Sequence, residues 1–418
     1  MYGLNELTWY AEYGDCGVGA FCLGGCDPRM SFTLDSCAPA PVCEDRKMDF
    51  KSLDRTVTIE KYFGDESKAD WVYQGEPAPF KGDVLLTMPK DSPGTVLAST
   101  TYMWYGNVKA RMKTSRGRGV VTAFILLSDV KDEIDYEWVG VDLEKSQTNY
   151  YFQGIPDYHN SGNISMSDSF NEFHDYEIRW TPDKIEWLID GKVGRSKDKK
   201  DTWNSTTHNW DFPQTPARVQ LSIWPGGQAS NAKGTIDWAG GLIDWNHPDV
   251  KNAGYFYATV ESVEITCYDT KSGPGSHQNK GYYYTDAKGT NDTVVDGKKS
   301  PILASSQATG LDPDKGKKPG DKNDKKPTVP GGGAPGQDHG DDNVDKSGDS
   351  GNNGDVGGGG GGDGTGATPS NCDPNSFNQK CGNTDNSGSG SGSGKSGSSK
   401  SSASALAIII AAGALFLL

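Results

Sequence analysis

Three carboxylates alternate with apolar residues in the segment EIDYEW, residues 133–138. Side chains two positions apart in a β-strand point to the same face, so Glu133, Asp135 and Glu137 would share one face of a strand. The apolar residues beside them would share the other face and could pack in a core. Like charges in one row repel each other, and ordinary protein surfaces mix their signs. We therefore interpret the row as a catalytic site; the alternative is a solvated strand face with a chance run of acids.

Carboxylates in this arrangement suit chemistry on glycosidic bonds. Retaining glycosidases place two carboxyl groups about 5–5.5 Å apart. The Cα atoms of Glu133 and Glu137 would lie about 13 Å apart in a strand that rises roughly 3.3 Å per residue, and two long side chains that lean together close most of that gap. Asp135 would lie between them and could bond one glutamate. Crowding raises the pKa of at least one carboxyl, so that a proton stays on the acid.

The segments around this row predict the β-structure that would position it. Between residues 50 and 270 the chain repeats short stretches rich in β-branched and aromatic residues, separated by turn signals such as Asp190-Gly191. Examples are YGNVKARMKT, VVTAFILLS, DYEIRWTPDKIEWLIDG and VQLSIW. No long stretch shows the period of an amphipathic helix. The pattern is typical of an antiparallel β-sandwich, and we expect an all-β domain of the jelly-roll, concanavalin-like type over residues 46–270.

The C-terminal part has a different composition. Of the 418 residues, 55 are glycine, and 25 of these lie within the last 108 residues. Such a chain buries too little apolar surface to offset its ordering entropy, so we expect residues 271–400 to form a disordered stalk. Residues 401–418 are apolar but too short for a comfortable transmembrane helix. With the small polar residues before them they predict a GPI-attachment signal, attached within Asn386–Gly394; the alternative is a tail-anchor helix.

Composition also limits the compartment, the partners and the cofactors. Five of the eight cysteines lie within the first 43 residues without a nearby histidine, which predicts disulfides and an oxidising compartment. The net charge of −15 argues against nucleic acid as a partner. The histidines are scattered and no phosphate loop occurs in the sequence, so we expect no metal and no cofactor. Three N-glycosylation sequons agree with the oxidising compartment: Asn163-Ile-Ser165, Asn204-Ser-Thr206 and Asn291-Asp-Thr293.

The stretch DEIDYEW matches the Glu-x-Asp-x-Glu motif of glycoside hydrolase family 16. Further stretches, SFTLDSC, CLGGCDPR, LSIWPGG and GTIDWAGG, resemble the fungal Crh cell-wall transglycosylases and in particular their Utr2-like branch. The resemblance implies that Glu133 is the nucleophile, Asp135 its helper and Glu137 the acid/base, which also contacts substrate. It implies chitin contacts from three downstream residues, with Trp238 as a weaker candidate: Gln220, Trp224 and Thr235. The alternative for Trp224 is a place in the core.

The N-terminal segment, residues 1–45, resembles the second half of a hevein-type chitin-binding module. In that resemblance, Tyr13 and Phe21 would provide the aromatic platform for a sugar. The residues that fit the module's pattern are Gly14, Cys16, Gly17 and Cys22. The alternative is a disulfide-bonded cap on the main domain.

Three functions are compatible with these observations. The first is a retaining transglycosylase that joins chitin to β-glucan, and the family resemblance implies a monomer at the fungal cell surface and wall, held to the plasma membrane by a GPI anchor. The second is a plain β-glucan or chitin hydrolase on the same fold, because the two activities differ only in the acceptor. The third is a non-catalytic carbohydrate-binding sandwich, against which the complete row of carboxylates argues.

Overall fold

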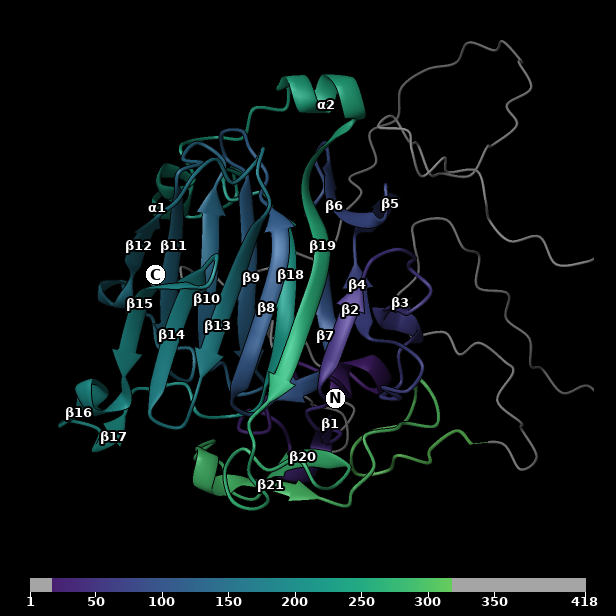
Figure 1. Ribbon diagram of the computed structural model, residues 1–418. Coiled ribbons are helices and arrows are strands. Elements are labelled where there is room, and N and C mark those ends of the chain that lie inside the picture. Colours follow the sequence, from purple (N-terminus) through teal and green to yellow (C-terminus); the bar gives the residue numbers. More distant parts are fainter. Residues whose placement is uncertain (1–16, 318–418) are drawn as a thin grey trace, which may run out of the picture.

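The computed structural model describes residues 17–317 of the chain. Two large β-sheets pack face to face, and smaller elements cover one end of them (Figure 1). This arrangement confirms the predicted all-β sandwich of the jelly-roll type. The apolar tail, the predicted attachment segment, Tyr13 and Cys16 lie outside the described residues.

Each large sheet has eight strands. The first sheet has the order β12-β11-β10-β9-β18-β7-β4-β3, and the second has the order β15-β14-β13-β8-β19-β6-β5 with β2 paired to β19. The strand pairs are antiparallel except that β3 runs parallel to β4. The strands of the first sheet are β3 (Thr56–Thr58), β4 (Trp71–Gln74), β7 (Thr95–Met103), β9 (Val121–Ser128), β10 (Glu133–Val139), β11 (Lys145–Tyr151), β12 (Gly162–Ser165) and β18 (Ala217–Trp224). Those of the second are β2 (Arg46–Asp49), β5 (Glu76–Phe80), β6 (Asp83–Pro89), β8 (Gly106–Lys113), β13 (His174–Trp180), β14 (Lys184–Ile189), β15 (Lys192–Asp198) and β19 (Tyr255–Cys267).

Small elements complete the described part of the chain. A third sheet has the order β1-β20-β21, and a two-stranded hairpin consists of β16 and β17. Their bounds are β1 (Ala40–Pro41), β16 (Trp203–Asn204), β17 (Asn209–Trp210), β20 (Gly281–Tyr284) and β21 (Val294–Gly297). The two α-helices are α1 (Lys233–Trp238) and α2 (Pro248–Ala253). Short 3-10 helices are η1 (Gly19–Cys22), η2 (Leu34–Ser36), η3 (Ile59–Lys61), η4 (Tyr158–Asn160), η5 (Lys199–Thr202) and η6 (Asn291–Thr293).

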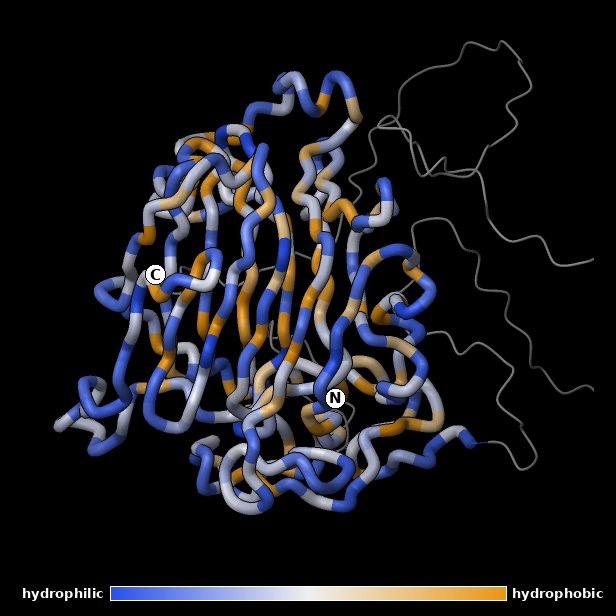
Figure 2. Tube along the Cα trace, in the orientation of Figure 1, coloured by the Kyte–Doolittle hydropathy of each residue, from blue (hydrophilic) through white to orange (hydrophobic). Residues whose placement is uncertain are grey.

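The main core lies between the two large sheets and explains the alternation in the sequence. Ile134, Tyr136 and Trp138 of β10 point into it and are almost fully buried. Burial of such side chains contributes about 1.5–3 kcal/mol each. Apolar and polar residues accordingly alternate along the central strands (Figure 2). The residues that alternate with these core residues point to the opposite side of the first sheet, which we call the outer face.

Hydrogen bonds across the core hold β10 against the second sheet. The hydroxyl of Tyr136 donates to the carbonyl oxygen of Leu188 in β14 at 2.9 Å. In the other direction, the indole N–H of Trp187 in β14 donates to the carbonyl oxygen of Asp135 at 3.0 Å. Because both bonds are buried, shifting β10 would leave polar groups without partners in an apolar surrounding. The strand that carries the carboxylates is therefore fixed in position from its core-facing side.

The segment after the sandwich is folded, so the predicted stalk is wrong for residues 271–317. Tyr282 and Tyr284 of β20 join the main core, and Leu303 and Ala308 pack with Cys22 and Leu23 of the N-terminal segment. Backbone hydrogen bonds tie the same parts together, for example from the N–H of Gly19 to the carbonyl oxygen of Ala308 at 2.8 Å. In Figure 1 these elements lie together below the sandwich. A composition averaged over residues 271–400 hid this local group of aromatic and apolar residues.

Two disulfides occur in the described part of the chain. Cys26 pairs with Cys37 inside the N-terminal segment, and Cys43 pairs with Cys267 at the end of β19. The remaining described cysteine, Cys22, is buried and has no disulfide partner among residues 17–317. The prediction of disulfides is confirmed, and the second one joins the start of the sandwich to its end.

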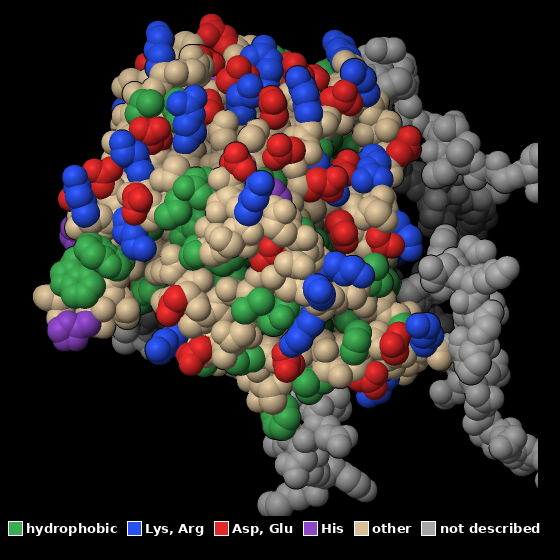
Figure 3. Space-filling model, turned by 60° about the horizontal axis from the view of Figure 1, so that its bottom comes forward, with side chains coloured by type: hydrophobic (Ala, Val, Ile, Leu, Met, Phe, Trp, Pro, Cys, Tyr) green, Lys and Arg blue, Asp and Glu red, His purple; other side chains and the backbone are tan. Residues whose placement is uncertain are grey.

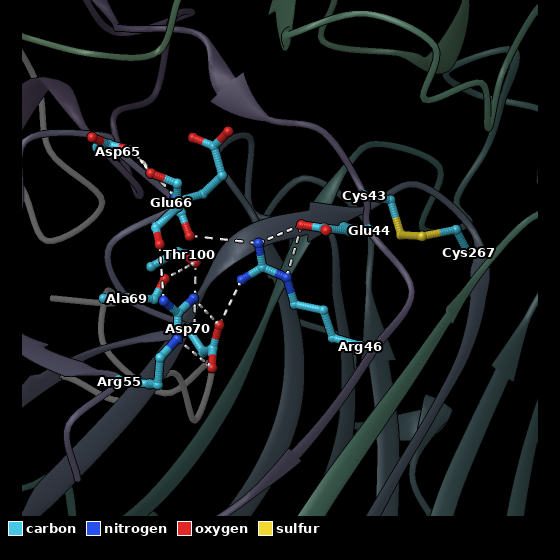
Figure 4. Close-up of polar contacts among 11 residues, drawn as sticks. Cys43, Glu44, Arg46, Arg55, Asp65, Glu66, Ala69, Asp70, Thr100 and Cys267 are labelled. Atoms are coloured by element: carbon cyan, nitrogen blue, oxygen red, sulfur yellow. Dashed lines mark hydrogen bonds and ion pairs between the residues drawn. A yellow bond between two sulfur atoms is a disulfide. The ribbon is translucent and has the colours of Figure 1, made fainter.

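A charged cluster stands beside the Cys43–Cys267 bridge (Figure 4). The guanidinium groups of Arg46 and Arg55 both donate to the carboxylate of Asp70, at 2.8 and 2.7 Å to the same oxygen. Asp70 precedes β4 of the first sheet, whereas Arg46 begins β2, which pairs with the second sheet. The cluster therefore ties the two sheets together near the bridge.

On the face seen in Figure 3, acidic and basic side chains are interspersed and form no large area of a single sign. Such mixing avoids repulsion between like charges on that face. Among the helices of residues 17–317, none has the length and apolar character needed to cross a membrane.

Candidate active site

The carboxylate row lies on the outer face of β10, in the interior of the first sheet. Through strand pairing, each carboxylate also belongs to a row of residues that runs across the neighbouring strands. Glu133 lies opposite Leu127 of β9 and Tyr151 of β11. The corresponding neighbours of Asp135 are Ile125 and Asn149, and those of Glu137 are Ala123 and Gln147. The alternation predicted for EIDYEW is thus present, with the three acids on one face and the apolar three in the core.

The carboxylates are closely surrounded by neighbouring side chains. Glu133 is 4% exposed and Asp135 is 1% exposed, and Glu137 is partly buried. Apolar neighbours on β9 surround the acids: Ala123, Ile125 and Leu127 form a buried cluster on the same face. The sequence pattern shows which face a side chain takes, but not how closely the neighbouring strands surround it.

Burial shapes the electrostatics of the row. The pKa of Glu137 is raised well above its ordinary value, mainly by burial and further by the negative charge of Asp135. The pKa of Asp135 is also raised, again mainly by burial, with contributions from the charge of Glu133 and from a hydrogen bond with it. Crowding therefore acts as predicted but is the smaller cause. Glu137 therefore keeps its proton to a higher pH than an ordinary glutamate does, as a general acid requires.

One oxygen of Glu137 has no protein partner. Its Oε1 is buried and has no hydrogen-bond partner within residues 17–317. Buried polar atoms normally have a partner, so this oxygen is available to bond a water molecule or a ligand atom. A glycosidic oxygen that accepts a proton from Glu137 would be such an atom.

Two of the implied substrate contacts, Gln220 and Trp224, lie on the outer face of β18. Gln220 pairs with Ile125, which itself pairs with Asp135, so Gln220 lies in the aspartate's row. Trp224 packs with Val121, Val139 and Ala239 in a cluster separate from the main core. Trp224 is thus buried in a small apolar cluster on the outer face, and both its substrate contact and its core alternative stay predictions. Its indole N–H is buried without a partner among the described residues.

The other two candidates come from α1 and lean over the same face. Trp238 stacks on Trp224 with ring centroids 6.0 Å apart, and its indole N–H donates to Oε1 of Gln147 at 2.7 Å. Since Gln147 lies opposite Glu137, the weaker candidate Trp238 is tied directly to the acid's row. Thr235 is buried, and its hydroxyl has no hydrogen-bond partner in the described part of the chain.

Sequence reasoning missed the contribution of β11. Gln147, Asn149 and Tyr151 alternate along KSQTNYY and face the three carboxylates. The pKa of the Tyr151 hydroxyl is raised by burial and by the charges of Asp135, Glu133 and Glu137, and this hydroxyl accepts a hydrogen bond from Asn149 at 2.7 Å. A polar alternation in the strand next to the acid row was the available signal.

Asp132, the residue before the row, anchors the start of β10. It is almost fully buried, and its carboxylate accepts four hydrogen bonds. Oδ2 accepts from the backbone N–H groups of Gln214 and Thr215 at 2.9 and 3.1 Å and from the Thr215 hydroxyl at 2.7 Å. Oδ1 accepts from the N–H of Gln153 at 3.0 Å. Burial raises its pKa to about 6, against the effect of these donors.

Asp132→Asn should lower both stability and activity. The NH2 group of the new amide would face at least one of the four donors and could not accept its hydrogen bond. Leaving a buried donor without a partner lowers the free energy of unfolding by about 1–3 kcal/mol. Activity should fall as well, because Glu133 follows directly. Denaturant unfolding and kcat/KM measure the two effects. Asp142→Asn is the matched control, since Asp142 pairs with Lys145 at the surface and should change stability by less than about 1 kcal/mol. Equal stability of the two variants would contradict the anchoring role of Asp132.

Comparisons with known proteins identify the family of the chain. Residues 65–240 match the family described as Glycosyl hydrolases family 16. The chain is 60% identical to Crh-like protein 3 of Botryotinia fuckeliana over 306 residues, which cover 73% of this chain and 69% of that protein. It is 47% identical to Crh-like protein UTR2 of Candida albicans, over 72% of this chain and 67% of the relative.

A solved structure, Apo Crh5 transglycosylase, is similar with a TM-score of 0.52 and 29% identity, covering 65% of this chain and 99% of that one. The same transglycosylase has been solved in complex with NAG, with the same similarity. The two-sheet fold, the carboxylate row and these matches define the class: the chain belongs to glycoside hydrolase family 16. Within that family its relatives are Crh-like proteins, as the sequence motifs predicted.

Proposed function

We propose that the protein is a retaining transglycosylase of the fungal cell wall that transfers chitin chains to β-glucan. The observation that carries this proposal is the row on β10, where the buried carboxylates of Glu133 and Asp135 share one face with the partly buried Glu137 and the pKa of Glu137 is raised. The similar Crh5 transglycosylase and the Crh-like relatives support transfer as the activity.

The first half of the proposed reaction forms a covalent intermediate. Glu137 gives its proton to the glycosidic oxygen, and the bond between that oxygen and the anomeric carbon breaks. The Glu133 carboxylate attacks the same carbon from the opposite face, so that a glycosyl-enzyme ester forms and the shortened chain leaves. Asp135, between the two glutamates, bonds to Glu133 and adds negative charge beside Glu137.

The second half transfers the sugar to an acceptor. Glu137, now ionised, removes the proton from an acceptor hydroxyl, and the hydroxyl oxygen displaces Glu133 from the anomeric carbon. Two inversions retain the original configuration. Trp224 and Trp238 have flat apolar faces suited to sugar rings, and Gln220 and Thr235 add polar groups beside them. These contacts favour a sugar acceptor over water because only a sugar can use them.

Asp135→Asn should move the alkaline limit of activity to lower pH. The first step needs protonated Glu137, so activity is present below the pKa of Glu137 and is lost as the pH rises through it. The charge of Asp135 contributes to the raised pKa, and its removal lowers that pKa while burial, the larger cause, remains. The alkaline limb of a kcat/KM profile against pH reports the shift. Residual activity should be intermediate, and an unmoved or higher limb would contradict this role.

The activity itself is tested with a chito-oligosaccharide donor and a fluorescent β-1,3-glucan oligomer as acceptor. Transfer yields fluorescent products whose masses equal the acceptor plus donor sugar units. If unlabelled shortened chito-oligosaccharides form instead, the protein is a hydrolase. If no product forms with well-folded protein, the binding-module alternative holds.

The proposed location is the cell surface and wall, as the Crh-like names of the relatives and the disulfides suggest. Attachment through a GPI anchor remains a prediction from the tail sequence, and phospholipase release of the protein from membranes would support it. A mature chain that retains Leu418 would refute it. Chitin binding by the N-terminal segment also stays a prediction; of its aromatic pair, Phe21 is partly buried in η1.

A further inference from the structure

A glycosylation sequon lies on the strand that ends the first sheet. β12 is the last strand beside β11 and contains Asn163-Ile-Ser165. Ile164 points into the core, whereas Asn163 and Ser165 are exposed. The strand is at the surface, so both the asparagine amide and the serine hydroxyl of the sequon are accessible.

Strand register puts Asn163 on the same face as the carboxylates. Asn163 lies opposite Gln147 of β11, and Gln147 lies opposite Glu137 of β10. Two strand spacings of about 4.8 Å separate Asn163 from Glu137, so the two backbones are roughly 10 Å apart. Gln147, between them, is the residue bonded to Trp238. Asn163 thus stands at the end of the acid's own row.

The other two sequons are engaged in the fold. The amide of Asn291 donates to the hydroxyl of Tyr105 at 3.2 Å, and the Tyr105 ring is fully buried. The amide of Asn204 donates to the carboxylate of Asp211 at 2.9 Å, and its oxygen accepts from backbone N–H groups of the same hairpin. The Asn163 side chain, in contrast, forms no hydrogen bond within residues 17–317. Of the three sequon asparagines, Asn163 is the one that can be glycosylated without breaking a hydrogen bond of the described fold.

We propose that Asn163 carries an N-linked glycan that borders the active site on the β12 side and limits the substrate chains that can pass over that edge. In the modification, the amide nitrogen of Asn163 bonds to the anomeric carbon of a lipid-linked oligosaccharide. The bond from that carbon to the lipid pyrophosphate breaks, the pyrophosphate leaves with the electron pair, and the amide nitrogen loses one proton.

The glycan would have two physical consequences. A bulky hydrophilic group on β12 covers an unpaired strand edge and so prevents pairing with other chains. It also occupies space beside Gln147 on the outer face. A short substrate that spans β9 to β11 would avoid the glycan, whereas a long chain that continues across β12 would meet it. This second consequence rests on the proposed function; occupancy of Asn163 does not.

Occupancy is tested by producing the full chain in a eukaryotic secretory host and mapping glycopeptides by mass spectrometry. The expected result is a glycan at Asn163. An endoglycosidase that leaves a single N-acetylglucosamine then removes most of the glycan without a mutation. The ratio of kcat/KM for long over short chito-oligosaccharide donors should rise several-fold after this treatment. An unmodified Asn163, or a ratio that trimming leaves unchanged, would overturn the proposal.

Variants separate the glycan from the residue. Asn163→Gln and Ser165→Ala both remove the sequon, and Ser165→Ala keeps the asparagine, so both should reproduce the trimmed enzyme. Asn204→Gln removes a different sequon and should leave the ratio unchanged. Thermal unfolding verifies that each variant is folded. If the protein fails to transfer sugars, the mapping still decides occupancy, and hydrolysis or binding of the same long and short oligomers supplies the ratio.

Discussion

Glu133→Gln should abolish formation of the glycosyl-enzyme and lower kcat/KM by roughly 10⁴-fold or more, as expected for the loss of a catalytic nucleophile. The amide has no negative oxygen with which to attack the anomeric carbon. The substitution keeps the size of the side chain in a site that is almost fully buried, so the sheet around it should persist. Intact-mass spectrometry of the enzyme mixed with an activated aryl glycoside measures the covalent adduct directly.

Two comparisons make this result specific. Glu144→Gln changes an exposed glutamate directly before the next strand, β11, and should leave both adduct and activity unchanged. Thermal unfolding of Glu133→Gln should stay near that of the parent protein. A full-size adduct on Glu133→Gln would show that another group is the nucleophile.

Glu137→Gln should fail in a different way, because it removes the proton donor and the later base. Donors with poor leaving groups should lose about 10²–10⁴-fold in rate. An activated aryl glycoside needs little protonation, so it should still load Glu133 and release its aryl group in a burst. Turnover should then stall, since no base remains to activate the acceptor hydroxyl. Stopped-flow release of the aryl group and accumulation of the adduct measure the two phases.

Azide distinguishes the two glutamates. It is a nucleophile that needs no base, so it should restore turnover of Glu137→Gln and give a glycosyl azide of retained configuration. The configuration of the product is read by NMR. Rescue of Glu133→Gln with an inverted azide, together with a dead Glu137→Gln, would mean that the two roles are exchanged.

The sequence predicted the row on β10 because its cause is local. A period of two fixes which side chains share a face, and EIDYEW leaves no second arrangement that buries its aromatic residues. The partners of the row depend on strand order, which the local pattern does not contain. Tyr151 comes from the next strand, and Trp238 comes from a short helix about 100 residues later in the chain. The near-complete burial of Asp135 depends on those same neighbours.

The sequence was least informative where packing partners lie far apart in the chain. The hydroxyl of Tyr282 accepts a hydrogen bond from the backbone N–H of Cys43 at 3.3 Å, 239 residues away in the chain. No window of composition can find such a contact. The glycine-rich average over the C-terminal third therefore concealed a folded segment that holds the N-terminal residues against the sandwich.

The bridge between Cys43 and Cys267 makes the sandwich a closed ring of chain. The two cysteines are separated by 224 residues, and every strand from β2 to β19 lies between them. A mechanical load applied to the two ends of the protein therefore passes through the covalent bridge and bypasses the hydrogen bonds of both large sheets. The carboxylate row lies in the part of the chain that this load bypasses, which suits an enzyme that acts on polymers in a wall under tension. The geometry of the row should persist under forces that unfold residues 281–317.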